Sequence, residues 1–166
     1  QWSRHRGATV IGTVGSADKA ARAREMGCDH TILYREVDFV PAVKELVPEG
    51  VSAVFDGVGR DTFVKSMDCT RRYGMLVNYG NASGHVPPID LLTLSFKGSL
   101  SVSRPGIHNY LHDRPATLEA ADRLFGLVRD GVLTVEIGGT YPLKDAAQAH
   151  EDVEARSITG SVVLIP

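Results

Sequence analysis

Cysteine is scarce in this chain of 166 residues: only Cys28 and Cys69 are present, and they lie far apart in the sequence. Two distant cysteines exclude the disulfide-rich scaffolds of small secreted proteins. They fit a reducing compartment, so we expect a cytoplasmic protein. They also form no C-x-x-C pair, and the sequence therefore shows no zinc-binding pattern.

Long apolar runs and an excess of one charge are also missing. No stretch approaches the length of a membrane span and no signal peptide opens the chain, so we expect no membrane partner. Acidic and basic residues nearly balance, 20 against 18, and the formal net charge is −2. This balance gives no electrostatic reason to expect nucleic acid as a partner.

Several catalytic signatures are absent as well. His108 and His112 are four residues apart, but the glutamate that a zinc protease places between such a pair is not there. No tyrosine is followed by a lysine four residues later, which argues against the short-chain dehydrogenases, and no G-x-S-x-G nucleophile elbow occurs. The sequence therefore does not indicate a self-contained acid–base or nucleophilic site.

The chain instead alternates apolar, β-branched segments with amphipathic ones. We expect strands at residues 8–14, 31–34, 51–55, 74–79, 99–103, 133–137 and 161–165. We expect helices at about 17–26, 39–47, 61–70, 117–129 and 144–156, of which the first two are capped by Ser16 and Asp38. This alternation predicts an α/β fold with a Rossmann-like, doubly wound parallel sheet that helices cover on both faces.

Glycine-rich turns follow three of the expected strands, at residues 12–16, 57–59 and 80–84. Each alone is more often an ordinary tight turn. Three at carboxyl ends of strands favour a nucleotide crevice, because ligands of open α/β sheets bind there and glycine permits close backbone approach. No complete G-x-G-x-x-G is present, and the nearest match, which begins at Gly57, ends in Thr62.

The end of the first expected strand bears on the choice of nucleotide. An NAD site usually has Asp or Glu there, which binds the ribose hydroxyls, but this chain has Gly15 and Ser16, followed by Lys19. A small polar residue and a lysine suit the additional 2′-phosphate of NADP, which a carboxylate would repel. Asp18 partly offsets the charge of Lys19.

Six segments in order carry a resemblance to a known family: IGTVGS at 11–16, ILYREVDF at 32–39, DGVGRDTF at 56–63, NYGNASG at 78–84, KGSL at 97–100 with SRP at 103–105, and the end of the chain from 159. The series resembles the zeta-crystallin-like quinone oxidoreductases of the medium-chain dehydrogenase/reductase superfamily. The resemblance covers essentially the whole chain, and the motifs are specific together although not singly.

The resemblance implies a set of residues that contact the cofactor NADPH. These are Ser16, Lys19 and Tyr34 on the adenosine and 2′-phosphate side, Val58 and Gly59 over the adenine and ribose, Tyr79, Gly80, Asn81 and Ala82 beside the nicotinamide ribose, Ser103 and Arg104 near the nicotinamide, and Arg156 near the cofactor. Two positions depart from the pattern, since Tyr79 stands where phenylalanine is common and Ala82 where serine can occur.

The resemblance also implies an incomplete domain organisation. Residues 1–132 correspond to an NADP-binding Rossmann-like domain without its first, central strand and its main pyrophosphate turn. Residues 133–166 correspond to a segment that packs on a catalytic domain outside this chain. The strands at 8–14 and 51–55 are then each expected to have an unpaired edge, and residues 1–166 alone are not expected to reduce quinones.

The implied function is transfer of hydride or electrons from NADPH to a small-molecule quinone, without zinc and without a catalytic residue in this part of the protein. The expected edge strand at 99–103 and the family both point to a homodimer. Three alternatives stay open: an enoyl or alkenal reductase of the same superfamily, a non-catalytic NADPH-binding protein, and a methyltransferase. The last would want an acidic residue where Gly15 and Ser16 stand.

Overall fold

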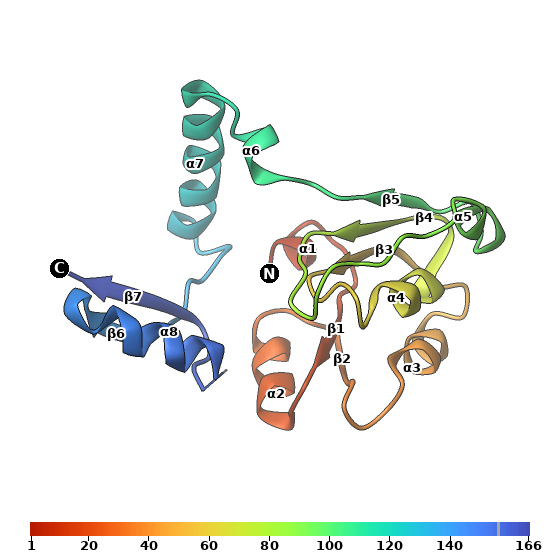
Figure 1. Ribbon diagram of the computed structural model, residues 1–166, viewed down its shortest axis with the longest axis horizontal. Helices are drawn as coiled ribbons and strands as arrows, with labels where there is room; N and C mark the ends of the chain where they lie inside the picture. The colour runs from red at the N-terminus through yellow and green to blue at the C-terminus, as the bar shows by residue number, and fades with distance from the viewer. Residues whose placement is uncertain (156) are drawn as a thin grey trace. The chain divides into compact units, whose positions relative to one another are not determined.

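The computed structural model describes residues 1–155 and 157–166, and it divides into two compact units, Ser3–Leu118 and Glu119–Pro166 (Figure 1). Each unit is described by itself. The boundary predicted near residue 132 comes from the family resemblance, and it stays a prediction. Among the described residues, no helix combines the length and the apolar character needed to cross a bilayer.

The first unit alternates helices and strands as predicted. Its elements are α1 (Trp2–His5), β1 (Ile11–Val14), α2 (Ala17–Glu25), β2 (His30–Leu33), α3 (Phe39–Leu46), β3 (Val51–Asp56), α4 (Phe63–Cys69), β4 (Thr70–Asn78), α5 (Leu92–Phe96), β5 (Ser101–Ser103) and α6 (Ile107–Tyr110). The helix α7 (Arg114–Arg129) crosses the boundary between the units.

Both predicted helix caps are confirmed. The Ser16 hydroxyl accepts a hydrogen bond from the Lys19 N–H at the start of α2, and the Asp38 carboxylate accepts one from the Val40 N–H at the start of α3. These bonds satisfy backbone donors that lack a partner in the first turn of a helix. Gly27, with φ of +104°, follows the end of α2 in the left-handed conformation that glycine favours there.

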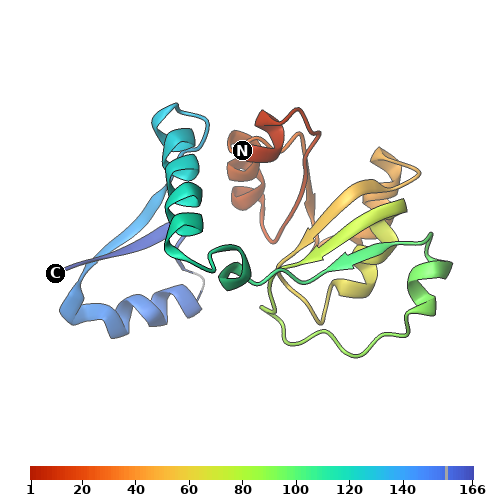
Figure 2. The same cartoon turned by 90° about the horizontal axis from the view of Figure 1, so that it is seen from above.

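The strands of this unit are parallel and form two sheets, β1–β2 and β3–β4–β5. Figure 2 shows β3, β4 and β5 side by side. Of the described strands, β1 pairs only with β2, and β3 pairs only with β4, so the unpaired edges expected for these two strands are confirmed. The short strand β5 lies at the far edge of its sheet, again as expected.

Two apolar clusters hold the unit together. The first packs α4 against the β3–β4–β5 sheet through Phe63, Met67, Leu76 and Leu100. The second is centred on Ile32, Val43 and Cys69 and includes partly buried residues of β1, α3 and β3. Because α3 contacts residues of both sheets in this cluster, it holds the β1–β2 pair beside β3 without hydrogen bonds between the sheets.

The other face of β3–β4–β5 is less covered within this unit. On that face, Phe55 and Met75 are 66% and 44% exposed. For this sheet, the helix packing that the unit supplies lies on the α4 side.

Both cysteines are free thiols. Cys69 is buried in the second cluster, and burial, with a smaller contribution from the neighbouring Asp68 carboxylate, raises the pKa of the Cys69 thiol to about 11. The thiolate is the reactive form, so this cysteine serves as a core residue and is chemically inert near neutral pH.

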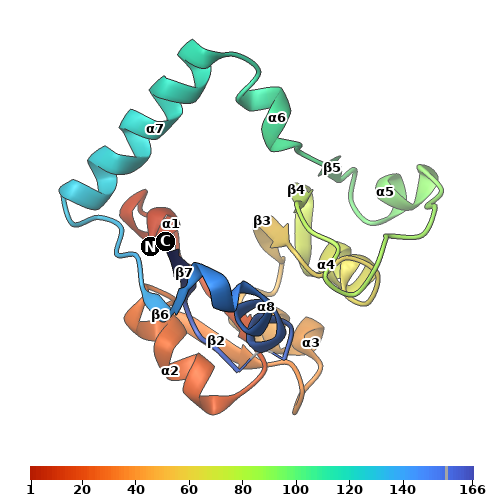
Figure 3. The same cartoon turned by 60° about the vertical axis from the view of Figure 1, so that its left-hand side comes forward.

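The second unit is a strand–helix–strand motif. It consists of β6 (Ile137–Pro142), a 3₁₀ turn (Leu143–Asp145), α8 (Ala146–Glu154) and β7 (Ser161–Ile165), with β6 and β7 parallel and α8 packed against both (Figure 3). The Tyr141 hydroxyl donates to the Asp152 carboxylate at 2.6 Å, which ties β6 to α8 and raises the pKa of Tyr141.

The strand expected at 133–137 is wrong, because the strand begins at Ile137, where the expected one ends. Val135 has high β propensity, but among the described residues the pairing of this strand with β7 reaches back only to Ile137. Pairing with β7 starts at the register Ile137 with Ser161 and continues to Pro142 with Ile165. Gly138 permits the close approach, since a Cβ there would collide with the Thr159 carbonyl. Tertiary pairing thus overrides local preference.

We expect Leu76→Ala to lower the free energy of unfolding by about 2–5 kcal/mol, because Leu76 is fully buried in the central strand of its sheet and truncation leaves a cavity. The measurement is a urea titration of the protein at its natural length. Leu91→Ala is the matched control, since Leu91 is 76% exposed and its loss should cost less than about 0.5 kcal/mol. Equal effects of the two variants would contradict this assignment of the core.

Candidate functional site

The carboxyl ends of the strands gather the predicted site residues into two groups. Ser16, Lys19 and Tyr34 follow β1 and β2, the residues predicted at 58–59 and 79–82 follow β3 and β4, and Ser103 and Arg104 are the last residue of β5 and the one after it. Because the strands within each sheet are parallel, the members of each group lie together at the carboxyl ends of the strands of that sheet. Arg156 lies outside the described residues.

A buried carboxylate organises the turn after β3. Asp56 is only 4% exposed, and its Oδ1 accepts hydrogen bonds from the N–H groups of Val58 and Gly59 at 2.8 and 2.9 Å. Its Oδ2 accepts from the hydroxyls of Thr62 and Ser66 at 2.8 and 2.9 Å. Four donors compensate the charge without a cation, so the carboxylate can remain in the core and hold the turn in one shape.

This arrangement limits what Val58 and Gly59 can offer a ligand. The Val58 N–H is bound to Asp56, and the Val58 carbonyl accepts from the N–H and the hydroxyl of Ser83 at 2.8 and 2.9 Å. The Val58 side chain, 40% exposed, is therefore the part left for contact, and it suits a flat ring better than a phosphate. Gly59 has φ of +89°, and a Cβ there would lie 2.7 Å from the Gly84 carbonyl, so only glycine fits.

The segment after β4 crosses directly over the turn after β3. A Cβ on Gly80 would collide with the Gly57 carbonyl, and the Tyr79 ring lies beside Gly57. The Asn78 amide donates to the carbonyls of Asp56 and Gly80 at 3.3 and 3.1 Å, and Asn78 is 5% exposed. These contacts fix the two chain segments against each other and leave 60% of the Tyr79 side chain exposed.

Arg104 connects the end of β5 to the end of β4 and the segment that follows it. Its Nη1 donates to the Asn78 carbonyl at 2.9 Å. The Asn81 side-chain amide is oriented so that its nitrogen faces an acceptor and its oxygen faces donors. Its nitrogen then donates to the Gly80 carbonyl at 2.8 Å, and its oxygen accepts from Arg104 Nη2 at 3.2 Å. Arg104, Asn78 and Asn81 thus form one network, whereas Ser103 and Ala82 contribute no side-chain bond to it.

The ends of β1 and β2 form a separate cradle. The Tyr34 N–H donates to the Val14 carbonyl at 3.1 Å, which brings the chain after β2 beside Gly15. A Cβ on Gly15 would lie 3.1 Å from the Tyr34 hydroxyl, so the bare α-carbon makes room for that side chain. No carboxylate stands at Gly15 or Ser16, and this is compatible with a phosphate at the position.

Sequence reasoning missed two of these residues, Asp56 and Asn78. Each is the last residue of its strand, directly before a glycine-containing turn. An Asp or Asn at that position can satisfy the N–H and C=O groups of the turn that follows, and this was the available signal.

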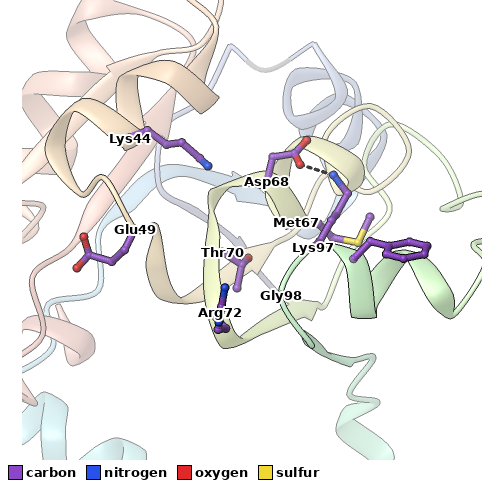
Figure 4. A pocket seen from close by; sticks show the side chains of 9 residues that line it. Lys44, Glu49, Met67, Asp68, Thr70, Arg72, Lys97 and Gly98 are labelled. Atoms are coloured by element: carbon purple, nitrogen blue, oxygen red, sulfur yellow. Dashed lines mark hydrogen bonds and ion pairs between the residues drawn. The ribbon is translucent and has the colours of Figure 1, made fainter.

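A pocket of about 380 Å³ lies at the opposite, amino end of β4 (Figure 4). It is lined by charged side chains, among them Lys44, Arg72 and the ion pair of Asp68 with Lys97. No predicted site residue lines it. Among the described residues, no group of three His, Cys, Asp or Glu side chains lies together in a way that could hold a metal ion.

We expect Asp56→Asn to lower the free energy of unfolding by about 1–3 kcal/mol, because one of the four donors around the carboxylate loses its acceptor in a buried site. Asp61→Asn is the matched control, since Asp61 is exposed and pairs only with exposed Arg60. Urea denaturation of both variants makes the comparison. A stability of Asp56→Asn equal to that of Asp61→Asn would show that the buried network is not required.

Comparison with known proteins identifies the relatives of this chain. A family model described as zinc-binding dehydrogenase matches residues 26–164. The chain is 45% identical to quinone oxidoreductase 1 of Escherichia coli (strain K12) over all of this chain and 52% of that protein. It is 44% identical to a 2-haloacrylate reductase of a Burkholderia species over 99% of this chain and 50% of that protein. The chain therefore spans about half the length of these relatives.

Solved structures agree. The E. coli quinone oxidoreductase complexed with NADPH matches with a TM-score of 0.93 at 45% identity, over 99% of this chain and 52% of that chain. The quinone oxidoreductase of Pseudomonas syringae pv. Tomato matches with a TM-score of 0.93 at 40% identity, over 99% and 51% of the two chains. The Rossmann-like fold class is thereby confirmed. The chain belongs to the zinc-binding dehydrogenase family, and the resemblance of its motifs to the cofactor-binding half of quinone oxidoreductases of the medium-chain dehydrogenase/reductase superfamily is confirmed.

Proposed function

We propose that this chain is the cofactor-binding part of an NADPH-dependent quinone oxidoreductase. The observation that carries the proposal is the similarity over the whole chain to a quinone oxidoreductase that is complexed with NADPH. The chain's own residues support it, because the end of β1 carries Ser16 and Lys19 in place of the carboxylate typical of an NAD site.

We assign described residues to both the adenosine end and the nicotinamide end of such a cofactor. Ser16, Lys19 and Tyr34 would hold the adenosine and its 2′-phosphate, where Gly15 leaves space beside the Tyr34 hydroxyl. The Val58 side chain and the Gly59 backbone would lie against the adenine and ribose. Residues 79–82, Ser103 and Arg104 would bound the nicotinamide side, and Arg156 is proposed to lie near the cofactor as well.

Bound NADPH supplies the hydride, and the protein orients it. In this part of the protein we assign no catalytic residue. The Asp56 and Arg104 networks keep the strand ends rigid, so that a flat ring meets a preformed surface rather than a mobile one. We propose that the reaction does not need zinc, because a quinone accepts hydride or electrons without a Lewis acid.

A second candidate function is reduction of an activated carbon–carbon double bond. The 2-haloacrylate reductase is nearly as similar to this chain as the quinone oxidoreductase, at 44% against 45% identity. Both candidates use the same hydride donor, so the cofactor-binding part alone does not favour one. The substrate would contact the part of the protein that lies outside this chain.

We also propose the domain organisation and the compartment of the protein from its similarity to these relatives. Residues 133–166 would pack on a catalytic domain outside this chain, residues 1–132 would form the NADP-binding domain, and the protein would act in the cytoplasm. The exposed Ile137 and Ile165 side chains, 60% and 50% exposed, support the first point, because they leave apolar surface on the second unit.

We expect the protein at its natural length to oxidise NADPH rapidly with a simple quinone and slowly with 2-chloroacrylate. The loss of nicotinamide absorbance measures both rates. Residues 1–166 alone should be inactive in this assay, because the other wall of the substrate cleft would be missing. Faster turnover of the haloacrylate would favour the second candidate, and no turnover of either substrate would favour a non-catalytic NADPH-binding protein.

Lys19→Ala should weaken binding of NADPH by about 10- to 100-fold while leaving binding of NADH nearly unchanged, because a charge-assisted contact to the 2′-phosphate contributes about 1.5–3 kcal/mol. Titrations that follow the quenching of intrinsic fluorescence give both dissociation constants. If the ratio of the two constants does not move, Lys19 does not contact the phosphate.

We expect a homodimer that forms through the edge strand β5, since an unpaired edge can pair with its copy around a twofold axis. Analytical ultracentrifugation of the protein at its natural length measures the mass in solution. A monomer at every concentration tested would rule this out.

A further inference from the structure

Arg35 is a charged residue beside the Gly15 cradle that has no role in the site described above. It follows Tyr34 directly after β2, and the parallel register of Val14 with Leu33 places both residues at the carboxyl end of β1. The hydrogen bond from the Tyr34 N–H to the Val14 carbonyl, at 3.1 Å, holds this segment against the end of β1.

The Arg35 side chain folds back over the cradle. A Cβ on Gly15 would lie 3.3 Å from Arg35 Nε and 3.1 Å from the Tyr34 hydroxyl. The guanidinium therefore lies beside the same bare α-carbon as the tyrosine hydroxyl, next to Ser16. Any side chain larger than hydrogen at Gly15 would push both groups away from this position.

Arg35 makes no ion pair or side-chain hydrogen bond with any residue in the described part of the chain. The Glu36 carboxylate, next in the sequence, makes no direct contact with it, and Arg35 is exposed. A guanidinium without a protein partner, held beside Gly15 and the Tyr34 hydroxyl, is suited to binding a phosphate dianion. Its role in packing is small, because it is exposed.

We propose that Arg35 determines specificity for NADPH by binding the 2′-phosphate from the β2 side, opposite the contribution of Lys19 from α2. The inference rests on the proposed function, since it takes NADPH as the cofactor. The planar guanidinium can offer two parallel N–H groups to two phosphate oxygens, which the ammonium of Lys19 cannot do. Two cations on different elements would also fix the orientation of the phosphate.

The experiment compares dissociation constants of NADPH and NADH for the protein at its natural length and for its Arg35→Ala variant, by fluorescence titration without a substrate. We expect Arg35→Ala to weaken NADPH binding roughly 10- to 100-fold, with NADH binding changed less than about twofold. Unchanged NADH binding also shows that the variant is folded. The loss should shrink at high salt, because an exposed charge pair is screened.

Two further variants sharpen the test. Arg35→Lys should retain part of the preference for NADPH, because the charge stays and the paired N–H groups are lost. Arg24→Ala is the matched control, since Arg24 is an exposed arginine in the last turn of α2, and it should bind both cofactors normally. A normal preference for NADPH in Arg35→Ala would overturn the proposal, as would an equal loss for both cofactors.

The outcomes for the unmodified protein separate this inference from the function on which it rests. If the unmodified protein shows no preference for NADPH, the proposed cofactor is wrong, and the result does not depend on Arg35. If the unmodified protein prefers NADPH and Arg35→Ala does so equally, the cofactor stands and only the role of Arg35 is refuted.

Discussion

The Asp56 carboxylate is the interaction on which the arrangement of the strand ends depends. A charge in the core is costly unless hydrogen bonds replace its water, and here two N–H groups and two hydroxyls do so. The same bonds hold Val58 and Gly59 in one conformation. Asn78 then bridges the Asp56 carbonyl to the Gly80 carbonyl, and Arg104 bonds to the Asn78 carbonyl. Three strand ends are thus connected in sequence to one buried charge.

This rigidity has a consequence for recognition. Most backbone groups of the turn after β3 are used within the protein, so a ligand there meets an apolar side chain and glycine surfaces. The β1–β2 end is different in chemistry, because Ser16, Lys19, Tyr34 and Arg35 offer hydroxyls and cations. A cofactor with a flat ring at one end and a phosphate at the other matches that division between the two sheets.

The packing of α3 explains how the two sheets of the first unit stay together. Val43 lies in one cluster with Ile32 of β2, Cys69 of α4 and partly buried residues of β1 and β3. Apolar contact is not directional, so it can hold β1 beside β3 while the facing backbone edges of both strands remain unpaired. The proposed cofactor site can therefore include residues of both sheets.

The sequence by itself determined the features that depend on neighbours along the chain. The caps at Ser16 and Asp38, the α/β alternation and the glycine turns are local, because they follow from side-chain hydrogen bonds and periodicity within a few residues. The motif series also indicated the family. These predictions succeeded because local backbone preference and tertiary packing agree at those positions.

Only the tertiary structure decided the remainder. The strand expected at 133–137 begins instead at Ile137, because a strand forms where a partner such as β7 pairs with it. The bonds that Asp56 receives from Thr62 and Ser66, and the position of Arg35 beside Gly15, join residues from different elements or turns. Such contacts depend on how the chain folds back on itself, and no periodicity or spacing in the sequence encodes that directly.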